Sequence, residues 1–369
     1  MNASDDNPMH IAVLGAGGTI APPIVRDLAA SPEVASMNLL DIDAERAAAV
    51  AAANGAGKAS AQAVDATDVG ALADALADAD VLVNSASYRV NLEAMRACLR
   101  AGCHYLDLGG LYWMTQRQLE LGPEFERAGL LAVLGIGSSP GKTNLMARAA
   151  VAMLGAPDTV DSIDVAAAGR DPEAAGDERP RPPYAIQTLL DELTLEPVVL
   201  RGFEAVQIAP LSPGGVVDYG DPIGSAETIY TLHSELATFG PSFGCANASF
   251  RLSLSAPLLE RLVELTSASP AEVTQAGRDA APQSNRTVSV HLVVVGAGGR
   301  TITARAVTRP HNGVGGSVNS TAAPAAAAVR LLARGSLEAR GAHPPERCIE
   351  PEEMFAELRA RGCSFSFEG

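Results

Sequence analysis

The chain has 369 residues, of which 47% are hydrophobic and 19% are charged, so it can bury a substantial core and is not a disordered tail. Its formal net charge of -16 at pH 7 disfavours nucleic acid and anionic membranes as partners. The N-terminal residues lack a secretion signal, no apolar run reaches the roughly 20 residues of a membrane-spanning helix, and the five cysteines lack close C-x-x-C pairs. We therefore expect a cytoplasmic globular protein with two domains or one elaborated domain.

Residues 9–145 alternate between short apolar segments and segments with helical spacing. Strands are predicted at 9–14, 37–43, 61–66, 79–86, 104–110 and 130–137. Helical patterns lie at about 20–31, 45–54, 69–77 and 91–102. Near-continuous apolar strands linked by helices form a parallel sheet that is covered on both faces. We therefore expect an α/β domain with a Rossmann-type doubly wound parallel sheet.

After about Ala150 the pattern changes to longer or alternating strands separated by Pro- and Gly-rich loops. This pattern is typical of a mostly antiparallel sheet. Residues 287–295 and 300–308 are expected to form a hairpin, because both alternate and the letters GAGG join them. From Pro324 onward the pattern is helical again, so the tail can return to the first domain.

A glycine turn lies between the first predicted strand and the first helix. There, backbone amides and the helix N-terminus can approach a pyrophosphate without a Cβ in the way. We expect the cofactor to contact Gly15, Gly17, Gly18, Thr19 and Ile20. Ile20 stands where the G-x-G-x-x-G pattern has its third glycine, so a plain tight turn without a ligand is the alternative.

Two aspartates end the second predicted strand, where a carboxylate can accept hydrogen bonds from the adenosine ribose. Of these, Asp41 is the better candidate and Asp43 the second. A carboxylate repels a 2′-phosphate, so NAD is favoured. NADP stays open, because Arg46 follows closely in the sequence and an arginine can bind the 2′-phosphate. The alternative is a solvated aspartate at the end of a strand.

Two further strand ends are expected to face the cofactor, because ligands of parallel sheets bind at the carboxyl ends of strands. Asp65 follows the third strand and is placed to meet the adenine. Asn84, Ser85 and Ala86 end the fourth strand and are placed to meet the nicotinamide ribose.

Several stretches together resemble the saccharopine dehydrogenase family, especially its lysine 6-dehydrogenase-like branch. They are GAGG after the first strand, NSASYRVNLEAMRACLRAGCHYLDLGG, GIGSSPGKTNLMA, YAIQTLLDE, YTLHSE and GAHPPERCIEPEEMFAELRARG. The resemblance implies a Rossmann domain at 9–145, an inserted α+β catalytic domain with a mixed, mostly antiparallel sheet and dimer contacts at 146–316, and a helical segment at 317–369 that returns to the Rossmann domain. It therefore also implies a homodimer.

The resemblance further implies hydride transfer between NAD(P) and an amine or imine centre of an amino acid. The expected enzyme is a lysine 6-dehydrogenase-like oxidoreductase that acts on CH-NH2 or CH-NH donors of a basic amino acid. Saccharopine-type or carboxynorspermidine-type reductive condensation and a non-catalytic dinucleotide sensor are the alternatives. By resemblance, Gly137, Pro140 and Gly141 form the floor of the nicotinamide pocket, and Tyr184 and Glu192 lie near the substrate.

Amine oxidation needs a base that removes a proton from the substrate ammonium. His233 is the first candidate, and strand alternation would point Glu235 to the same side to orient its ring. Lys142, one of only two lysines in the chain, is placed to bind a substrate carboxylate or to act as a base. Tyr88 is placed to close over the nicotinamide or to hydrogen-bond the substrate. Structural hydrogen bonds of His233 and a solvated Lys142 are the alternatives.

Other polar residues remain open as site candidates. The sequence does not choose among Arg89, Arg251 and Arg300 for binding a substrate carboxylate. Tyr105 and Asp107 lie at a strand end that faces the expected cleft, although a core position is the better interpretation of Tyr105. The remaining histidines show no metal-ligand spacing, so no metal is expected.

Overall fold

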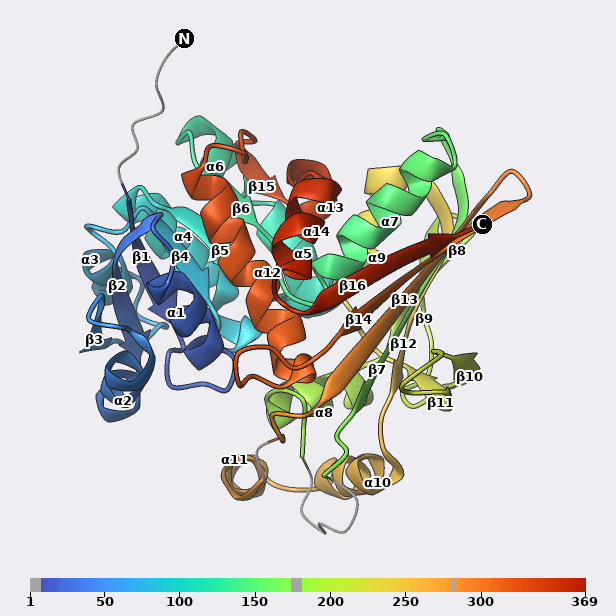
Figure 1. Cartoon of the computed structure of the whole chain (residues 1–369), viewed down its shortest axis with the longest axis horizontal. Coiled ribbons are helices and arrows are strands. Elements are labelled where there is room, and N and C mark those ends of the chain that lie inside the picture. Colours follow the sequence, from blue (N-terminus) through green and yellow to red (C-terminus); the bar gives the residue numbers. More distant parts are fainter. Residues whose placement is uncertain (1–7, 174–180, 281–282) are drawn as a thin grey trace. The chain divides into compact units, whose positions relative to one another are not determined.

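The computed structural model describes residues 8–173, 181–280 and 283–369, and the chain divides into two compact units, each built around one sheet (Figure 1). The first unit contains the residues up to Lys142 together with Thr321–Glu357, and the second contains Thr143–Ser320 and Leu358–Gly369. Three helices span the boundaries between these segments: α7 (Lys142–Met153), α12 (Gly316–Ala333) and α14 (Pro351–Arg359).

The first unit has a seven-stranded sheet in the order β15-β6-β5-β4-β1-β2-β3, and all its strand pairs are parallel. Its strands are β1 (Met9–Leu14), β2 (Val34–Asp41), β3 (Ala59–Ala63), β4 (Val81–Asn84), β5 (His104–Asp107), β6 (Leu131–Val133) and β15 (Gly341–His343). Strands β1 to β6 lie in the Rossmann order 3-2-1-4-5-6, which confirms the predicted doubly wound sheet. The order reverses between β1 and β4, where such sheets bind their ligands.

Helices and one 3-10 turn connect these strands. They are α1 (Ala21–Ala29), α2 (Ala44–Asn54), α3 (Val69–Ala75), η1 (Tyr88–Val90), α4 (Asn91–Ala101), α5 (Leu111–Leu119), α6 (Gly122–Arg127) and α13 (Pro345–Cys348). Helix α2 begins at a cap, because the carboxylate of Asp43 accepts a hydrogen bond from the Arg46 amide. Helix α4 ends at Gly102, whose φ of +80° is a left-handed conformation that favours glycine.

The second unit has a nine-stranded mixed sheet in the order β10-β11-β12-β7-β13-β14-β16, with β8 and β9 joined beside β12. Its strands are β7 (Val160–Arg170), β8 (Val198–Arg201), β9 (Glu204–Gln207), β10 (Pro213–Asp218), β11 (Ser225–Tyr230), β12 (Cys245–Ser253), β13 (Val288–Ala297), β14 (Arg300–Thr308) and β16 (Cys363–Glu368). Among the described strands of this sheet, only β7 and β12 pair in parallel, so the mixed, mostly antiparallel sheet is confirmed. Strands β13 and β14 form the predicted hairpin.

The helices of the second unit are α8 (Ile186–Thr194), α9 (Glu235–Phe243), α10 (Ala256–Leu265) and α11 (Pro270–Asp279). Across the described ranges of the chain, no helix combines the length and the apolar character needed to cross a membrane. Two of the differences from the sequence expectation concern the site and the tail. Residues 227–232 alternate as in a strand, but the strand found there, β11, ends at Tyr230, and the last residues form strand β16 beside β14 rather than a helix.

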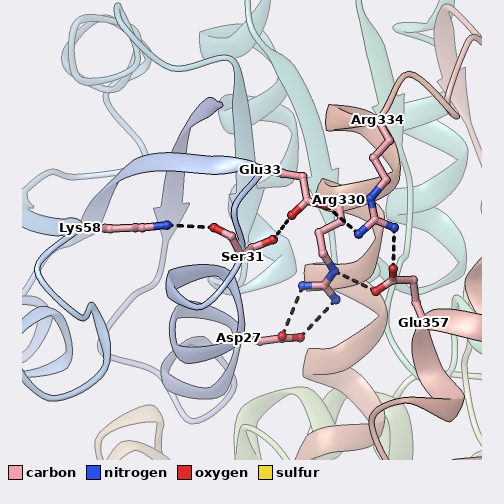
Figure 2. Close-up of polar contacts among 7 residues, drawn as sticks. All are labelled: Asp27, Ser31, Glu33, Lys58, Arg330, Arg334 and Glu357. Atoms are coloured by element: carbon pink, nitrogen blue, oxygen red, sulfur yellow. Dashed lines mark hydrogen bonds and ion pairs between the residues drawn. The ribbon is translucent and has the colours of Figure 1, made fainter. Parts of the chain in front are cut away.

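A network of charged side chains holds the C-terminal segment of the first unit to its N-terminal part (Figure 2). Arg330 on α12 is almost fully buried, and its guanidinium contacts Glu357 on α14 at 2.8 Å and Asp27 on α1 at 3.3 Å. Arg334, one helical turn later, bridges Glu357 at 2.7 Å and Glu33 at 2.6 Å. The network explains how residues about 300 positions apart in the sequence share one unit.

The same network continues into the turn between α1 and β2 (Figure 2). The Ser31 hydroxyl donates to Glu33 at 2.5 Å, and the Lys58 ammonium donates to the Ser31 carbonyl at 2.8 Å. Burial alone would raise the pKa of Glu33, but hydrogen bonds from Ser31 and Arg334 lower it to about 2. Glu33 therefore stays ionised, and its contribution to stability is lost only as the pH falls from about 4.5 through about 2.

We expect Arg330→Ala to destabilise the protein strongly, because it leaves two carboxylates without their buried partner. The expected loss in the free energy of unfolding is about 3–5 kcal/mol. Arg334→Ala is the matched control, since this side chain is 44% exposed and its removal should cost at most about 1 kcal/mol. Thermal and urea denaturation would measure both variants, and equal losses would contradict the dominant role of Arg330.

Candidate functional site

The dinucleotide turn, residues 15–20 between β1 and α1, follows the end of β1, next to the point where the strand order reverses. Gly15 has a φ of +74°, and a Cβ at this position would lie 2.6 Å from the backbone of Ala86 after β4. The Ser85 amide and hydroxyl both donate to the Leu14 carbonyl, at 2.9 and 2.7 Å. The two chain segments therefore touch through backbone atoms, and only glycine fits at position 15.

Asp41 lies directly on this turn. One carboxylate oxygen accepts from the Gly17 amide at 2.8 Å, and the other accepts from the Asp43 amide at 2.9 Å. The guanidinium of Arg46 donates to the Gly17 carbonyl, so an acidic and a basic side chain both hold the turn. Asp43 instead caps α2, which explains why two aspartates follow one strand.

The start of α1 leaves few backbone donors for an anion, because Pro22 and Pro23 have no N–H and only Ala21 of its first three residues has one. Thr19 is exposed, whereas Ile20 is buried and occupies the place of the third glycine. Within the described parts of the chain, no side chain caps the N-terminus of α1. The first amides of a helix need acceptors from outside, and a pyrophosphate is a suitable acceptor.

Two predicted contacts of the cofactor have different surroundings in the structure. Asp65 follows β3 by two residues, is exposed, and accepts from the Thr67 amide and hydroxyl at 2.9 and 2.7 Å; these bonds lower its pKa. The Asn84 side chain is buried and donates to Asn91 and Tyr105 at 2.9 and 3.2 Å. Both amide donors of Asn84 are thus used inside the unit, where they support the strand end, and its contact with the nicotinamide ribose stays a prediction.

A buried carboxylate organises the loops after β5 and β6. Asp107 is 1% exposed and accepts from the Tyr105 hydroxyl at 2.9 Å and from the Gln118 amide at 2.5 Å. It also accepts from the backbone amides of Gly109 and Gly135, at 2.9 and 2.7 Å. Burial raises the pKa of Asp107, and these donors oppose the rise. Tyr105 is fully buried in this network, which agrees with its interpretation as a core residue.

The glycines after β6 form a compact turn. The Gly137 amide donates to the Pro140 carbonyl at 2.9 Å, and the Lys142 amide donates to the Gly137 carbonyl at 3.0 Å. Gly141 has a φ of +123°, and a Cβ there would lie 2.4 Å from the Gly137 carbonyl oxygen. The Gly135 amide, two residues before Gly137, donates to Asp107, so the carboxylate network joins the turn whose residues are predicted to form the floor of the nicotinamide pocket.

In the second unit, His233 is buried between two carboxylates. Its Nδ1 lies 3.4 Å from Oε2 of Glu235, and its Nε2 lies 3.8 Å from Oε2 of Glu192. The ring stacks on Phe250 of β12, with a centroid distance of 3.4 Å and an interplanar angle of 16°. Among the described residues, neither ring nitrogen has a partner at hydrogen-bonding geometry. The ring is therefore held by stacking and by ion-pair contacts with both carboxylates.

Strand alternation does not bring His233 and Glu235 together, contrary to the sequence prediction. Strand β11 ends at Tyr230, and Glu235 is the first residue of α9. The turn into α9 places the carboxylate beside the ring, while Glu192 arrives from α8. The pair was thus predicted correctly as neighbours but for the wrong geometric reason.

Hydroxyl groups hold both carboxylates. The Tyr184 hydroxyl donates to Oε2 of Glu192 at 2.5 Å, and the Thr143 hydroxyl donates to Oε1 of Glu235 at 2.8 Å. The family resemblance placed Tyr184 and Glu192 near the substrate, but the sequence analysis assigned neither Thr143 nor Phe250 to the site. No pattern in the sequence connects Thr143 or Phe250 with a histidine about 90 or 17 residues away.

The charges around His233 decide its protonation state. Burial lowers the pKa of an imidazole, but Glu192 and Glu235 outweigh this effect and raise the pKa of His233 to about 9. Burial and the neighbouring Glu192 also raise the pKa of Tyr184 well above its ordinary value. His233 is therefore an imidazolium near neutral pH, and it stabilises the fold below pH 6.5 and loses this effect as the pH rises through about 9.

The other candidates belong to several different elements of the two units. Lys142 is buried at the start of α7, not solvated, and Tyr88 opens η1 with the guanidinium of Arg89 5.0 Å from its ring centroid; all three belong to the first unit. In the second unit, Arg251 of β12 donates to the Gly214 carbonyl at 3.1 Å, and Arg300 is exposed at the start of β14. Nowhere in the described residues do three or more potential metal ligands gather.

The first unit has the architecture of a dinucleotide-binding domain, and comparisons with known proteins show what the chain resembles. Residues 11–133 match the family described as "Saccharopine dehydrogenase NADP binding domain". The whole chain is similar to saccharopine dehydrogenase (L-Glu forming) from Saccharomyces cerevisiae, with 16% identity, a TM-score of 0.71, and coverage of 98% of this chain and 100% of that chain. The family match supports an NAD(P)-binding domain of the saccharopine dehydrogenase type in residues 11–133, and the structural likeness shows that the whole chain shares a fold with that enzyme.

Two other solved structures resemble the chain more weakly. A probable dehydrogenase from Thermotoga maritima is 13% identical, with a TM-score of 0.47 and coverage of 95% of this chain and 93% of that chain. GenD2 from gentamicin A biosynthesis, in complex with NAD, is 15% identical, with a TM-score of 0.45 and coverage of 100% and 99%.

We expect Asp107→Asn to destabilise the loops that Asp107 holds. The new amide group would face donors instead of accepting from them, so the expected loss in the free energy of unfolding is about 3 kcal/mol. Asp74→Asn on the exposed face of α3 is the matched control and should change stability by less than about 0.5 kcal/mol. Urea denaturation would compare the two variants, and a stability of Asp107→Asn equal to the wild type would refute the role of this carboxylate.

Proposed function

We propose that the protein is an NAD(P)-dependent dehydrogenase that oxidises the side-chain amine of a basic amino acid, like lysine 6-dehydrogenase. The observation that carries this proposal is the buried His233 with a carboxylate on each side. The first unit supplies the dinucleotide turn, and the second unit supplies the acid–base group. NAD is the preferred cofactor in this proposal, because Asp41 lies on the turn where a 2′-phosphate would meet its charge.

The charge of the cluster suits a cationic substrate. Two carboxylates and one imidazolium leave a net charge of -1 in a buried place, where an uncompensated charge is costly. A substrate ammonium compensates this charge. Its arrival beside the imidazolium also lowers the pKa of His233, because like charges disfavour each other. The ring can then release its proton and become the base that the reaction needs.

The reaction follows from this arrangement. His233 accepts a proton from the substrate ammonium, and the neutral amine then supplies its lone pair as a C=N bond forms. The bound nicotinamide supplies the chemistry of a hydride acceptor. Glu235 and Glu192 stabilise the imidazolium that results, and they stay next to the new iminium cation. Addition of water to the iminium and loss of ammonia complete the oxidation to an aldehyde.

The raised pKa of His233 favours a second candidate. An imidazolium at neutral pH can give a proton to an imine nitrogen, as required in the reductive joining of an amine with a carbonyl acid. This is the saccharopine-type or carboxynorspermidine-type condensation, and NADPH consumption that requires both an amine and a carbonyl acid would reveal it. A dinucleotide sensor without turnover is the third possibility.

The first test is a panel of lysine, ornithine, saccharopine and diamines with NAD and NADP, followed by the absorbance of the reduced nicotinamide. Reduction with a basic amino acid is the expected result. Tight binding of NADH without turnover on any amine, or on any pair of amine and carbonyl acid, would instead support the sensor. Size measurement on the same sample would test the proposed homodimer.

We expect His233→Gln to lower turnover by about 100-fold or more, because the base is removed while the size of the side chain is kept. In the wild type, kcat/KM for oxidation should rise with pH up to about 9, where free His233 loses its proton. The variant should lack this limb but keep any limb that belongs to the substrate amine. An unchanged pH profile in the variant would exclude His233 as the base, and unchanged NADH binding would show that the fold is intact.

We expect Asp41→Ser to weaken NAD binding and to favour NADP in relative terms, because the charge that repels a 2′-phosphate is removed. Asp43→Ser is the matched control: this carboxylate caps α2 and should leave the NAD/NADP ratio unchanged. Fluorescence titration with NADH and NADPH measures both variants. An NAD/NADP ratio that is the same in Asp41→Ser and the wild type would remove Asp41 from cofactor selection.

A further inference from the structure

The two carboxylates beside His233 are held in different ways. The Tyr184 hydroxyl donates to Oε2 of Glu192, which is the same oxygen that faces Nε2 of the ring. The Thr143 hydroxyl donates to Oε1 of Glu235, which is not the oxygen that faces the ring. Oε2 of Glu235 therefore keeps its full accepting power and has no hydrogen-bond partner in the described part of the chain.

This difference makes the two ring nitrogens unequal. Nδ1 faces a bare carboxylate oxygen at 3.4 Å, whereas Nε2 faces, at 3.8 Å, an oxygen that already accepts a short hydrogen bond. A proton on the ring is stabilised more by the nearer and less occupied oxygen. Nδ1 is thus the better place for the proton of a neutral imidazole, and Nε2 is the nitrogen with a free lone pair.

Burial keeps the hydrogen bond between Thr143 and Glu235 away from water. Thr143 and Glu235 are both 0% exposed, so water does not replace the Thr143 hydroxyl as a donor to the carboxylate. A carboxylate can only accept, so the hydroxyl must donate and its direction is fixed. Because Thr143 is the second residue of α7 and Glu235 the first of α9, the contact ties the starts of two helices to the ring.

We propose that Thr143 is a positioning residue that, through Glu235, keeps the proton of neutral His233 on Nδ1 and leaves Nε2 to exchange a proton with the substrate nitrogen. The inference rests on the proposed function for the identity of the substrate, but the tautomer itself is a property of the protein without substrate. The charged and titratable groups around the ring are Glu235 from α9, Glu192 from α8 and Tyr184 ahead of α8, while β12 contributes the apolar ring of Phe250.

The test compares Thr143→Val with Thr143→Ser, which keeps the hydroxyl. Thr266→Val is the control for the same change at an exposed threonine, whose hydroxyl only donates to the Val263 carbonyl. Protein labelled with ¹⁵N-histidine is titrated by NMR without substrate, and His233→Gln assigns the signal. Above the pKa, the ¹⁵N shifts distinguish a protonated Nδ1 from a protonated Nε2.

The wild type, Thr143→Ser and Thr266→Val are expected to show the Nδ1–H tautomer. Thr143→Val leaves a buried oxygen of Glu235 unpaired, so the ionised carboxylate is less stable and supports the imidazolium less. We therefore expect a lower pKa of His233 in this variant, by about half a unit or more, and a loss of the single tautomer. An Nε2–H tautomer in the wild type, or a Thr143→Val variant indistinguishable from Thr143→Ser, would overturn the inference whether or not the enzyme oxidises lysine.

A substrate that is turned over adds a second readout. Thr143→Val should lower kcat for amine oxidation by about 10-fold or more. It should also shift the rise of kcat/KM with pH to lower pH, whereas Thr143→Ser should restore both. Binding of NADH, which concerns the first unit, should not change. Failure of every substrate with the expected tautomer present would refute the proposed function and leave the positioning role of Thr143 in place.

Discussion

An imidazole buried between two carboxylates is the interaction that gives the second unit its chemical character. Burial by itself would keep His233 neutral, but Glu192 and Glu235 reverse this effect and raise its pKa to about 9. In the proposed function, this group stays protonated until the ammonium of the substrate arrives. The elements that surround the ring, from the start of α7 to α8, α9 and β12, serve to keep the three charged groups in contact while excluding water.

In the first unit, the important feature is the glycine turn after β1, which presents backbone amides to the pyrophosphate of a dinucleotide. Gly15 touches the backbone of Ala86, Asp41 accepts from the Gly17 amide, and the start of α1 carries no side-chain cap within the described residues. Ile20 does not prevent this arrangement, because it is buried at the start of α1 and lies outside the tight contact between Gly15 and Ala86. The C-terminal segment joins the unit through Arg330, and the loops beyond the sheet depend on Asp107.

Most strands and helices of the first unit could be predicted from the sequence, because the patterns that indicate them are local. A glycine turn between strand and helix, an aspartate at the end of β2 and continuous apolar strands all lie within a few residues of the features that they predict. The hairpin of β13 and β14 was predicted for the same reason. Asp43 shows the limit of this reasoning, since a helix cap and a ribose ligand are the same residue type at the same strand end.

The cluster around His233 depended on tertiary contacts, and the sequence could predict only part of it. His233 and Glu235 are close in sequence, but a turn into α9 joins them and not a strand. Tyr184 and Glu192 came from family resemblance, whereas Thr143 and Phe250 reach the ring from distant elements. Asn84 was assigned to the cofactor because it ends a strand, although its side chain turns toward Asn91 and Tyr105 inside the unit.

The most direct measurement is the NMR titration of His233 in ¹⁵N-histidine-labelled wild-type protein without substrate. We expect a pKa near 9, because two carboxylates outweigh the effect of burial. A pKa at or below the ordinary value of 6.5 would mean that the carboxylates do not support the imidazolium, and His233 would then lose its role as the group that waits for a cationic substrate.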